Sequence, residues 1–158
     1  MNLEKLIKEL KNGTGLGRAK AAIELGKIKD EAAAKALIEA LKDANSGVRS
    51  NAAFSLGELG ITKAIPQLAK LLFDPEEWVR KSSAKALGLL KANEAVPDLK
   101  KAVEDPASIV RKNVIRSLGR IGSEDAIKVL KQASRHLDSG IAKIAKETLD
   151  KIEQKKKF

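Results

Sequence analysis

A Val-Arg dipeptide recurs in this chain every 31 residues, and no other feature restricts the fold as strongly. It occurs at Val48-Arg49, Val79-Arg80 and Val110-Arg111, and the same step leads back to Arg18 and forward to Ala142. Leucine twelve residues before this anchor and glycine eight residues after it keep the same register: Leu6, Leu37, Leu68, Leu99, Leu130, Gly26, Gly57, Gly88 and Gly119. Five copies without an insertion between them indicate a repeat protein.

Each copy has the pattern of two consecutive helices. In the third copy, Ile65, Leu68 and Leu72 recur at the spacing of one helix face. Asp74-Pro75 then ends the first helix, because proline lacks an N–H donor and restricts the residue before it. Two helices of about 13 residues cannot bury their apolar faces alone, so the copies are expected to stack in series. The sequence predicts a single all-α domain with copies at about residues 1–29, 30–60, 61–91, 92–122 and 123–158.

Glycine falls inside the predicted second helices at Gly57, Gly88 and Gly119, where it costs about 1 kcal/mol relative to alanine. We expect the neighbouring helix to approach too closely for a side chain at these positions. The first and last copies are more polar and lack parts of the motif. Terminal copies must present a polar outer face to water, so these two are interpreted as caps.

The composition excludes several kinds of site. The chain has no cysteine, one histidine (His136) and no apolar run near the ~20 residues that span a bilayer. Thiolate chemistry and a histidine-rich metal centre are thereby excluded, and no acid, base or nucleophile cluster is visible. The segment up to Lys11 lacks the apolar stretch of a signal peptide. We therefore expect a cytoplasmic, non-enzymatic protein with no metal, cofactor or membrane partner.

The formal net charge of +10 is distributed unevenly. Residues 111–158 hold thirteen lysines and arginines and six acidic residues, which places +7 of the charge in this segment. A basic surface of this kind favours an acidic partner. The alternative is a lysine-rich surface that only maintains solubility, or the high Lys and Glu content common in thermophile proteins.

In a stack of helix pairs, the second helices are expected to line a concave face. The outward positions of this face are predicted to form a basic surface around an apolar patch of Phe54, Trp78 and Leu89. The candidate binding residues are Lys20, Lys27, Phe54, Trp78, Lys81, Lys85, Leu89, Lys112, Arg116, Arg120, Lys143 and Lys151. Two alternatives stay open: Trp78 packs partly buried between copies, and the basic stripe is an ordinary solvated face.

The order Ala-Ile-Pro-x-Leu, Leu-x-Asp-Pro and Val-Arg…Ala-Leu-Gly resembles the short HEAT-like repeats first noted in phycobilisome lyases. The pattern is clearest in residues 64–90 and 95–121 and is weaker in the terminal copies. The resemblance implies a right-handed α-solenoid, or superhelix, of five 31-residue helix-pair HEAT-like repeats. It implies little about function, because such repeats serve many roles.

The resemblance also implies a structural ladder, in which each arginine after a turn bridges to a turn aspartate of its own or the next copy. Its members here are Asp43, Arg49, Asp74, Arg80, Asp105 and Arg111. Arg18 has no partner in its own copy, because Asn12 stands at the matching turn position. Deoxyhypusine hydroxylase, a related repeat enzyme, holds iron through His-Glu pairs, and this chain has no such pair.

The function predicted from the sequence is that of a binding or scaffold module. A monomer would engage an acidic protein or peptide through the basic concave face. Nucleic-acid binding through phosphate contacts on the same face is the alternative.

Overall fold

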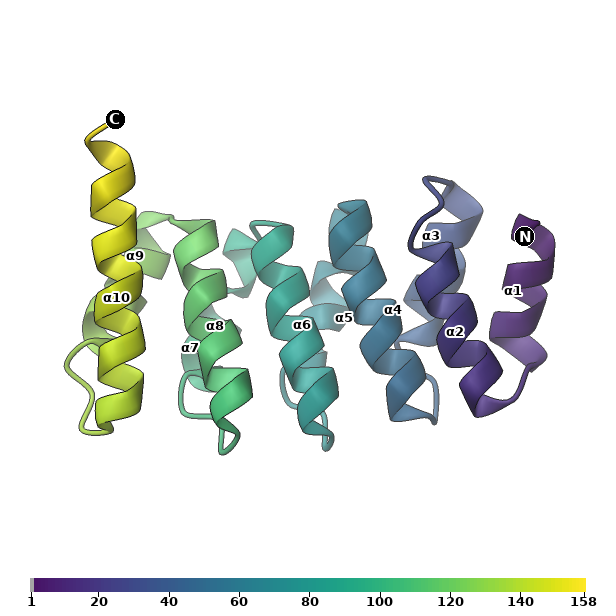
Figure 1. Cartoon of the computed structure of the whole chain (residues 1–158), viewed down its shortest axis with the longest axis horizontal. Coiled ribbons are helices and arrows are strands. Elements are labelled where there is room, and N and C mark those ends of the chain that lie inside the picture. The colour runs from purple at the N-terminus through teal and green to yellow at the C-terminus, as the bar shows by residue number, and fades with distance from the viewer. Residues whose placement is uncertain (1) are drawn as a thin grey trace.

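The computed structural model describes residues 2–158, and within them the chain forms five consecutive helix pairs. The pairs are α1 (Leu3–Asn12) and α2 (Gly15–Leu25), α3 (Glu31–Ala40) and α4 (Ser46–Leu59), α5 (Ile65–Leu71) and α6 (Glu77–Leu89), α7 (Val96–Ala102) and α8 (Ser108–Ile121), and α9 (Glu124–Ala133) and α10 (Ser139–Lys156). Strands are absent from this range. Figure 1 shows the pairs side by side in one row, with the even-numbered helices forming one layer and the odd-numbered helices the other. The predicted all-α solenoid is confirmed.

The first helices are shorter than the sequence suggested, with seven to ten residues each. In the third and fourth copies, Pro66 and Pro97 lie in the first turn of α5 and α7 and fix the start of each helix. The three residues before each of these helices form a 3-10 turn instead, at Thr62–Ala64 and Asn93–Ala95. The second helices are longer, with 11 to 18 residues.

The repeated leucines form the centre of one continuous core. Those before the anchor in copies two to five are fully buried, as are those at the end of the second helices in copies one to four: Leu37, Leu68, Leu99, Leu130, Leu25, Leu56, Leu87 and Leu118. Burial of each leucine contributes roughly 1.5–3 kcal/mol. Leu149, the equivalent of Leu118 in the last copy, is half-buried.

The glycines inside the second helices lie where consecutive second helices touch. A Cβ atom added at Gly57 would lie 2.7 Å from Cα of Ala86, and one at Gly88 would lie 2.7 Å from Cβ of Ser117. These distances are shorter than van der Waals contact, so the expected close approach is confirmed. Ser117 uses the proximity to donate a hydrogen bond of 2.7 Å to the carbonyl oxygen of Ala84 on the preceding second helix.

The turn arginines and aspartates pair across the boundaries between copies. Arg49 donates from Nε and Nη2 to the two carboxylate oxygens of Asp74, both at 2.9 Å. The same bidentate pair forms between Arg80 and Asp105. Arg18 also takes part, because it pairs with Asp43 of the next copy at 2.8 and 2.9 Å.

Arg111 departs from the expected ladder. Its guanidinium donates to the carbonyl oxygens of Asp105 and Pro106 in its own turn. Among residues 2–158, however, no carboxylate lies within salt-bridge distance of it. The position 25 residues further on, which holds aspartate for the other three arginines, holds His136. The His136 ring accepts the N–H of Asp138 at Nδ1, as the aspartates do for their own turns, and its Nε2 contacts Glu104 at 2.8 Å.

Candidate binding groove

The layer of even-numbered helices is hollowed at its C-terminal end. An open groove of about 1130 Å³ lies between the end of α6 and the helices α8 and α10. Its charged lining, which we call the basic groove, comprises Lys91, Lys112, Arg116, Arg120, Lys143, Lys151, Lys155, Lys156 and one acidic residue, Glu147. The remaining lining includes Leu89, Ile144 and Ile152. The site is therefore a cationic groove with apolar patches in its walls.

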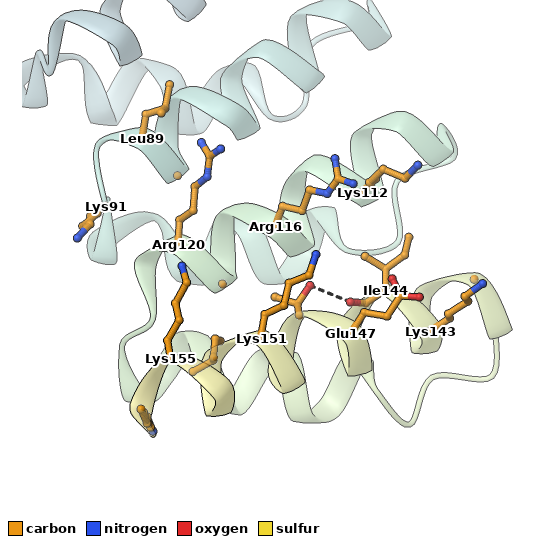
Figure 2. A pocket seen from close by; sticks show the side chains of 16 residues that line it. Leu89, Lys91, Lys112, Arg116, Arg120, Lys143, Ile144, Glu147, Lys151 and Lys155 are labelled. Atoms are coloured by element: carbon orange, nitrogen blue, oxygen red, sulfur yellow. Dashed lines mark hydrogen bonds between the residues drawn. The ribbon is translucent and has the colours of Figure 1, made fainter. Parts of the chain in front are cut away.

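Two helix stripes supply most of these charges. On α8, Lys112, Arg116 and Arg120 lie four residues apart and so share one face. On α10, Lys143, Glu147, Lys151 and Lys155 repeat at the same interval. Four residues correspond to about 6 Å along a helix axis. Figure 2 shows the two stripes on neighbouring helices, with Lys151 and Lys155 of α10 extending towards α8.

The groove cations are not neutralised by carboxylates of the described residues. Across residues 2–158, none of the eight lies within 4.0 Å of a carboxylate oxygen. Glu147 likewise takes part in none of these ion pairs. Elsewhere, Lys101 and Lys128 lie within 4.0 Å of Asp98 and Asp125 on their own helices. The unpaired charges create a positive potential that a bound anion would relieve.

Lys91 reaches the groove from an unusual backbone conformation. It has a φ of 47°, in the left-handed region that side chains other than glycine rarely adopt. The equivalent positions in copies two and four are Gly60 and Gly122, with φ values of 74° and 63°. Lysine therefore replaces glycine at the one such turn that borders the groove, at a cost of about 1 kcal/mol.

The groove contains half of the binding residues that the sequence suggested. Leu89, Lys112, Arg116, Arg120, Lys143 and Lys151 line it. Lys20 is exposed on α2, and Lys27 lies beyond the end of α2, paired with Glu24 at 2.6 Å. The helices α4 and α6 hold the other four, which lie outside the groove: Phe54, Trp78, Lys81 and Lys85.

The predicted single apolar patch of Phe54, Trp78 and Leu89 is wrong. Trp78 lies at the start of α6 and Leu89 at its end, about 16 Å apart along the axis. The Trp78 side chain is 57% exposed, with the ammonium of Lys81 4.9 Å from its ring centroid. The ammonium of Lys85 lies 4.6 Å from the Phe54 ring. Each of the two aromatic rings thus forms a separate cation–π contact with its own lysine.

Several groove residues were not identified from the sequence. Lys155 and Lys156 belong to α10. The signal for Lys155 was present, because the spacing of four from Lys143 through Lys151 continues to it. Lys91 was detectable only by aligning it with Gly60 and Gly122. Ile144 and Ile152 follow the apolar pattern of a helix, and nothing else in the sequence indicates that they line a groove.

Residues 2–158 contain neither a cluster of metal ligands nor a membrane-spanning helix. No group of three or more His, Cys, Asp or Glu side chains is arranged to hold a metal ion. No helix in the described part of the chain is long and apolar enough to cross a bilayer.

Comparison with known proteins agrees with this architecture. The structure of the complex of CpcE and CpcF of phycocyanin lyase from Nostoc sp. PCC7120 contains a chain with 31% sequence identity and a TM-score of 0.81. The alignment covers 98% of the present chain, which spans 66% of that chain. An engineered protein matches at 27% identity and a TM-score of 0.71, over 96% of this chain and 80% of the other.

A designed armadillo repeat protein in complex with the peptide (KR)4 shares the fold at 21% identity. Its TM-score is 0.66, over 94% of this chain and 80% of that one. No curated protein sequence matches the chain. HEAT repeats match residues 3–84 and 65–150, which together cover nearly the whole chain. The chain therefore belongs to the HEAT repeat family.

Proposed function

We propose that this chain is a non-enzymatic binding module whose basic groove holds an acidic segment of a partner protein. The observation that carries the proposal is the charge of the groove, which has eight cations and one carboxylate, all without ion-pair partners in residues 2–158. Charge complementarity of this kind steers an acidic partner towards the groove and excludes basic ones.

The lining favours a protein over a nucleic acid. Sites for single-stranded nucleic acids combine cations with aromatic side chains on which bases stack. None of the residues that line this groove is aromatic. Its apolar walls are formed by Leu89, Ile144 and Ile152. Aliphatic walls suit the methylene groups of Glu side chains and the apolar residues of a peptide.

The comparisons support the general mode of binding. A helix-repeat solenoid that holds a peptide is exemplified by the designed armadillo protein with (KR)4, although that peptide is basic. CpcE forms a complex with CpcF, which is a precedent for a protein partner on a similar repeat. The groove of the present chain is positively charged, so we expect its partner to be acidic.

A binding role agrees better with the groove than catalysis does. The groove has one carboxylate and lacks histidine, and its one hydroxyl, that of Thr148, donates to the carbonyl oxygen of Ile144 and not to a base. The lyase complex is an enzyme, but the present chain spans only 66% of the matched chain. Groups that such an enzyme requires can lie in the parts that are not shared.

The proposal is tested by titrating a fluorescent Glu-rich peptide with the wild-type protein and two double variants. Arg116→Glu with Arg120→Glu reverses two charges inside the groove. Lys128→Glu with Lys131→Glu changes the net charge equally, but on exposed positions of α9. We expect the groove variant to lose binding by at least about tenfold and the α9 variant to bind within about twofold of wild type. Equal losses in both variants would refute a specific site.

Salt dependence and a parallel titration with single-stranded DNA separate the two partner classes. Phosphate binding weakens steeply with salt, roughly in proportion to the number of contacts. If DNA binds more tightly than the peptide at physiological salt, the nucleic-acid alternative replaces the proposal. If neither ligand binds at low salt, the groove is not a site for anions.

A further inference from the structure

We propose that Glu147 makes the basic groove selective for a helical acidic segment with a central cation, and disfavours uniform polyanions. This inference rests on the proposed function, because it concerns which acidic ligands the same groove accepts. It assigns a specificity-determining role to the one carboxylate in the lining.

The position of Glu147 is the first observation. It lies on α10 one turn after Lys143 and one turn before Lys151, in the middle of the cationic stripe. Its side chain is exposed and forms no ion pair within 4.0 Å with any residue of 2–158. Figure 2 shows it between Lys151 and Lys143 on α10, with Arg116 on the neighbouring helix α8. A ligand that follows this stripe must pass the carboxylate.

A uniform polyanion cannot avoid placing a negative charge beside the Glu147 carboxylate. A nucleic-acid strand or a run of glutamates carries a negative charge at every repeat, so one charge is placed beside Glu147. Like charges brought together in an interface weaken binding, and such repulsion is a common source of specificity. The groove cations attract such ligands, while repulsion from Glu147 weakens their binding at the centre of the site.

A protein segment can place a cation at that one position. A helix with the sequence pattern Glu-x-x-x-Lys-x-x-x-Glu repeats its charges every four residues, or about 6 Å. The α10 stripe of Lys143, Glu147 and Lys151 has the same interval with opposite signs. Arg116 and Arg120 on the neighbouring helix α8 offer additional partners for the carboxylates of such a helix. The groove and the pattern are therefore complementary at three successive positions.

The experiment compares two helical peptides of identical composition and net charge. The first carries Glu, Lys and Glu at successive positions of one stripe and a third Glu on the opposite face. The second carries three Glu on that stripe and the Lys on the opposite face. A short single-stranded oligonucleotide is the third ligand. Each is titrated into wild-type protein, Glu147→Gln and the control Glu153→Gln, which removes a carboxylate from α10 outside the groove.

We expect wild type and Glu153→Gln to prefer the first peptide by about tenfold, and Glu147→Gln to lose this preference. Glu147→Gln should also bind the oligonucleotide several-fold more tightly than Glu153→Gln does. If both variants behave alike while wild type binds acidic peptides, Glu147 is not a specificity determinant and the proposed function survives. If wild type binds none of the three ligands, the proposed function fails, and this inference fails with it.

Discussion

Arg49 and Asp74, 25 residues apart in sequence, form a bidentate ion pair that joins the second copy to the third. The Nε and Nη2 atoms of Arg49 each lie 2.9 Å from a carboxylate oxygen, and its Nη1 donates to the carbonyl oxygen of Asp43 in its own turn. Only 14% of the arginine side chain and 6% of the aspartate side chain are exposed. One guanidinium thus fixes the turn of its own copy against the turn of the next.

Asp74→Asn should destabilise the protein by about 2 kcal/mol, because the amide cannot accept both hydrogen bonds and leaves a charged group poorly paired. Chemical denaturation followed by circular dichroism measures the change. Asp125→Asn is the matched control, since its pair with Lys128 spans 3.6 Å and both side chains are at least 70% exposed. Exposed pairs contribute about 0–1 kcal/mol. Equal effects of the two substitutions would contradict a structural role for the ladder.

Acid should weaken the same ladder. The pKa of Asp43 is lowered, mainly by the hydrogen bonds from Arg18 and with help from the Asn45 N–H. Burial alone would raise the pKa of Asp74, but the hydrogen bonds from Arg49 and the Glu76 N–H outweigh it, so this pKa is also lowered. Both values lie below the 3.8 of an unperturbed Asp.

A carboxyl group whose pKa is lower in the folded state stabilises the fold fully above its unfolded pKa. This stabilisation is lost as the pH falls through the lower folded value. We expect the free energy of unfolding to decrease below about pH 4, and the difference between wild type and Asp74→Asn to shrink over the same range. Urea titrations at several pH values measure both. A difference that stays constant down to about pH 2 would contradict the assignment.

Gly57→Ala tests the close approach of α4 and α6. The added methyl group would lie 2.7 Å from Cα of Ala86, a backbone atom that cannot move aside. We expect a loss of about 1–3 kcal/mol from overpacking, although alanine is the better helix former by about 1 kcal/mol. Gly47→Ala on the same helix is the control. A methyl group there meets only the Asn45 side chain at 3.0 Å and Ala19 at 3.9 Å. A stabilised Gly57→Ala protein would contradict the packing.

The repeat unit was predictable because its signals are local and recur. The buried leucines and the interior glycines recur every 31 residues because each copy packs against the next in the same way. In the structure they lie at the contacts between neighbouring copies. The binding groove was predictable only in part. Arg116 and Arg120 follow from their spacing on one helix face. Lys155 continues the spacing of four from Lys143 through Lys151, whereas Lys91 reaches the groove through a left-handed turn that no short pattern at this position signals.

The end of the ladder was missed for a related reason. The sequence pattern identifies arginines after each turn, but an arginine pairs with the copy that follows. Arg111 donates to the backbone carbonyl oxygen of Asp105, but the position that would supply its carboxylate is residue 136, which is histidine.

His136→Asp should extend the ladder by one step and stabilise the protein by about 1–2 kcal/mol. An aspartate at this position would accept from the N–H of Asp138, as His136 Nδ1 does, and would offer a carboxylate to Arg111. The contact with Glu104 would be lost, but the Glu104 side chain is 70% exposed, so this loss costs little. His136→Asn is the control, because it supplies the turn acceptor without the charge. If the Asp variant is no more stable than the Asn variant under thermal or chemical denaturation, Arg111 gains nothing from a carboxylate there.

Lys91→Gly should separate stability from binding. Lysine at a φ of 47° is strained, whereas glycine adopts this conformation freely, as Gly60 and Gly122 do. We expect the glycine variant to be more stable by about 0.5–1 kcal/mol, after the greater flexibility of glycine in the unfolded chain is included. The same variant removes one of the eight groove cations, so it should bind a Glu-rich peptide several-fold more weakly. Lys91→Gln retains the strain without the charge and should show the weaker binding with unchanged stability. A Lys91→Gln protein that binds as wild type does would show that the lysine charge contributes nothing to the groove, and the strained turn would then need another explanation.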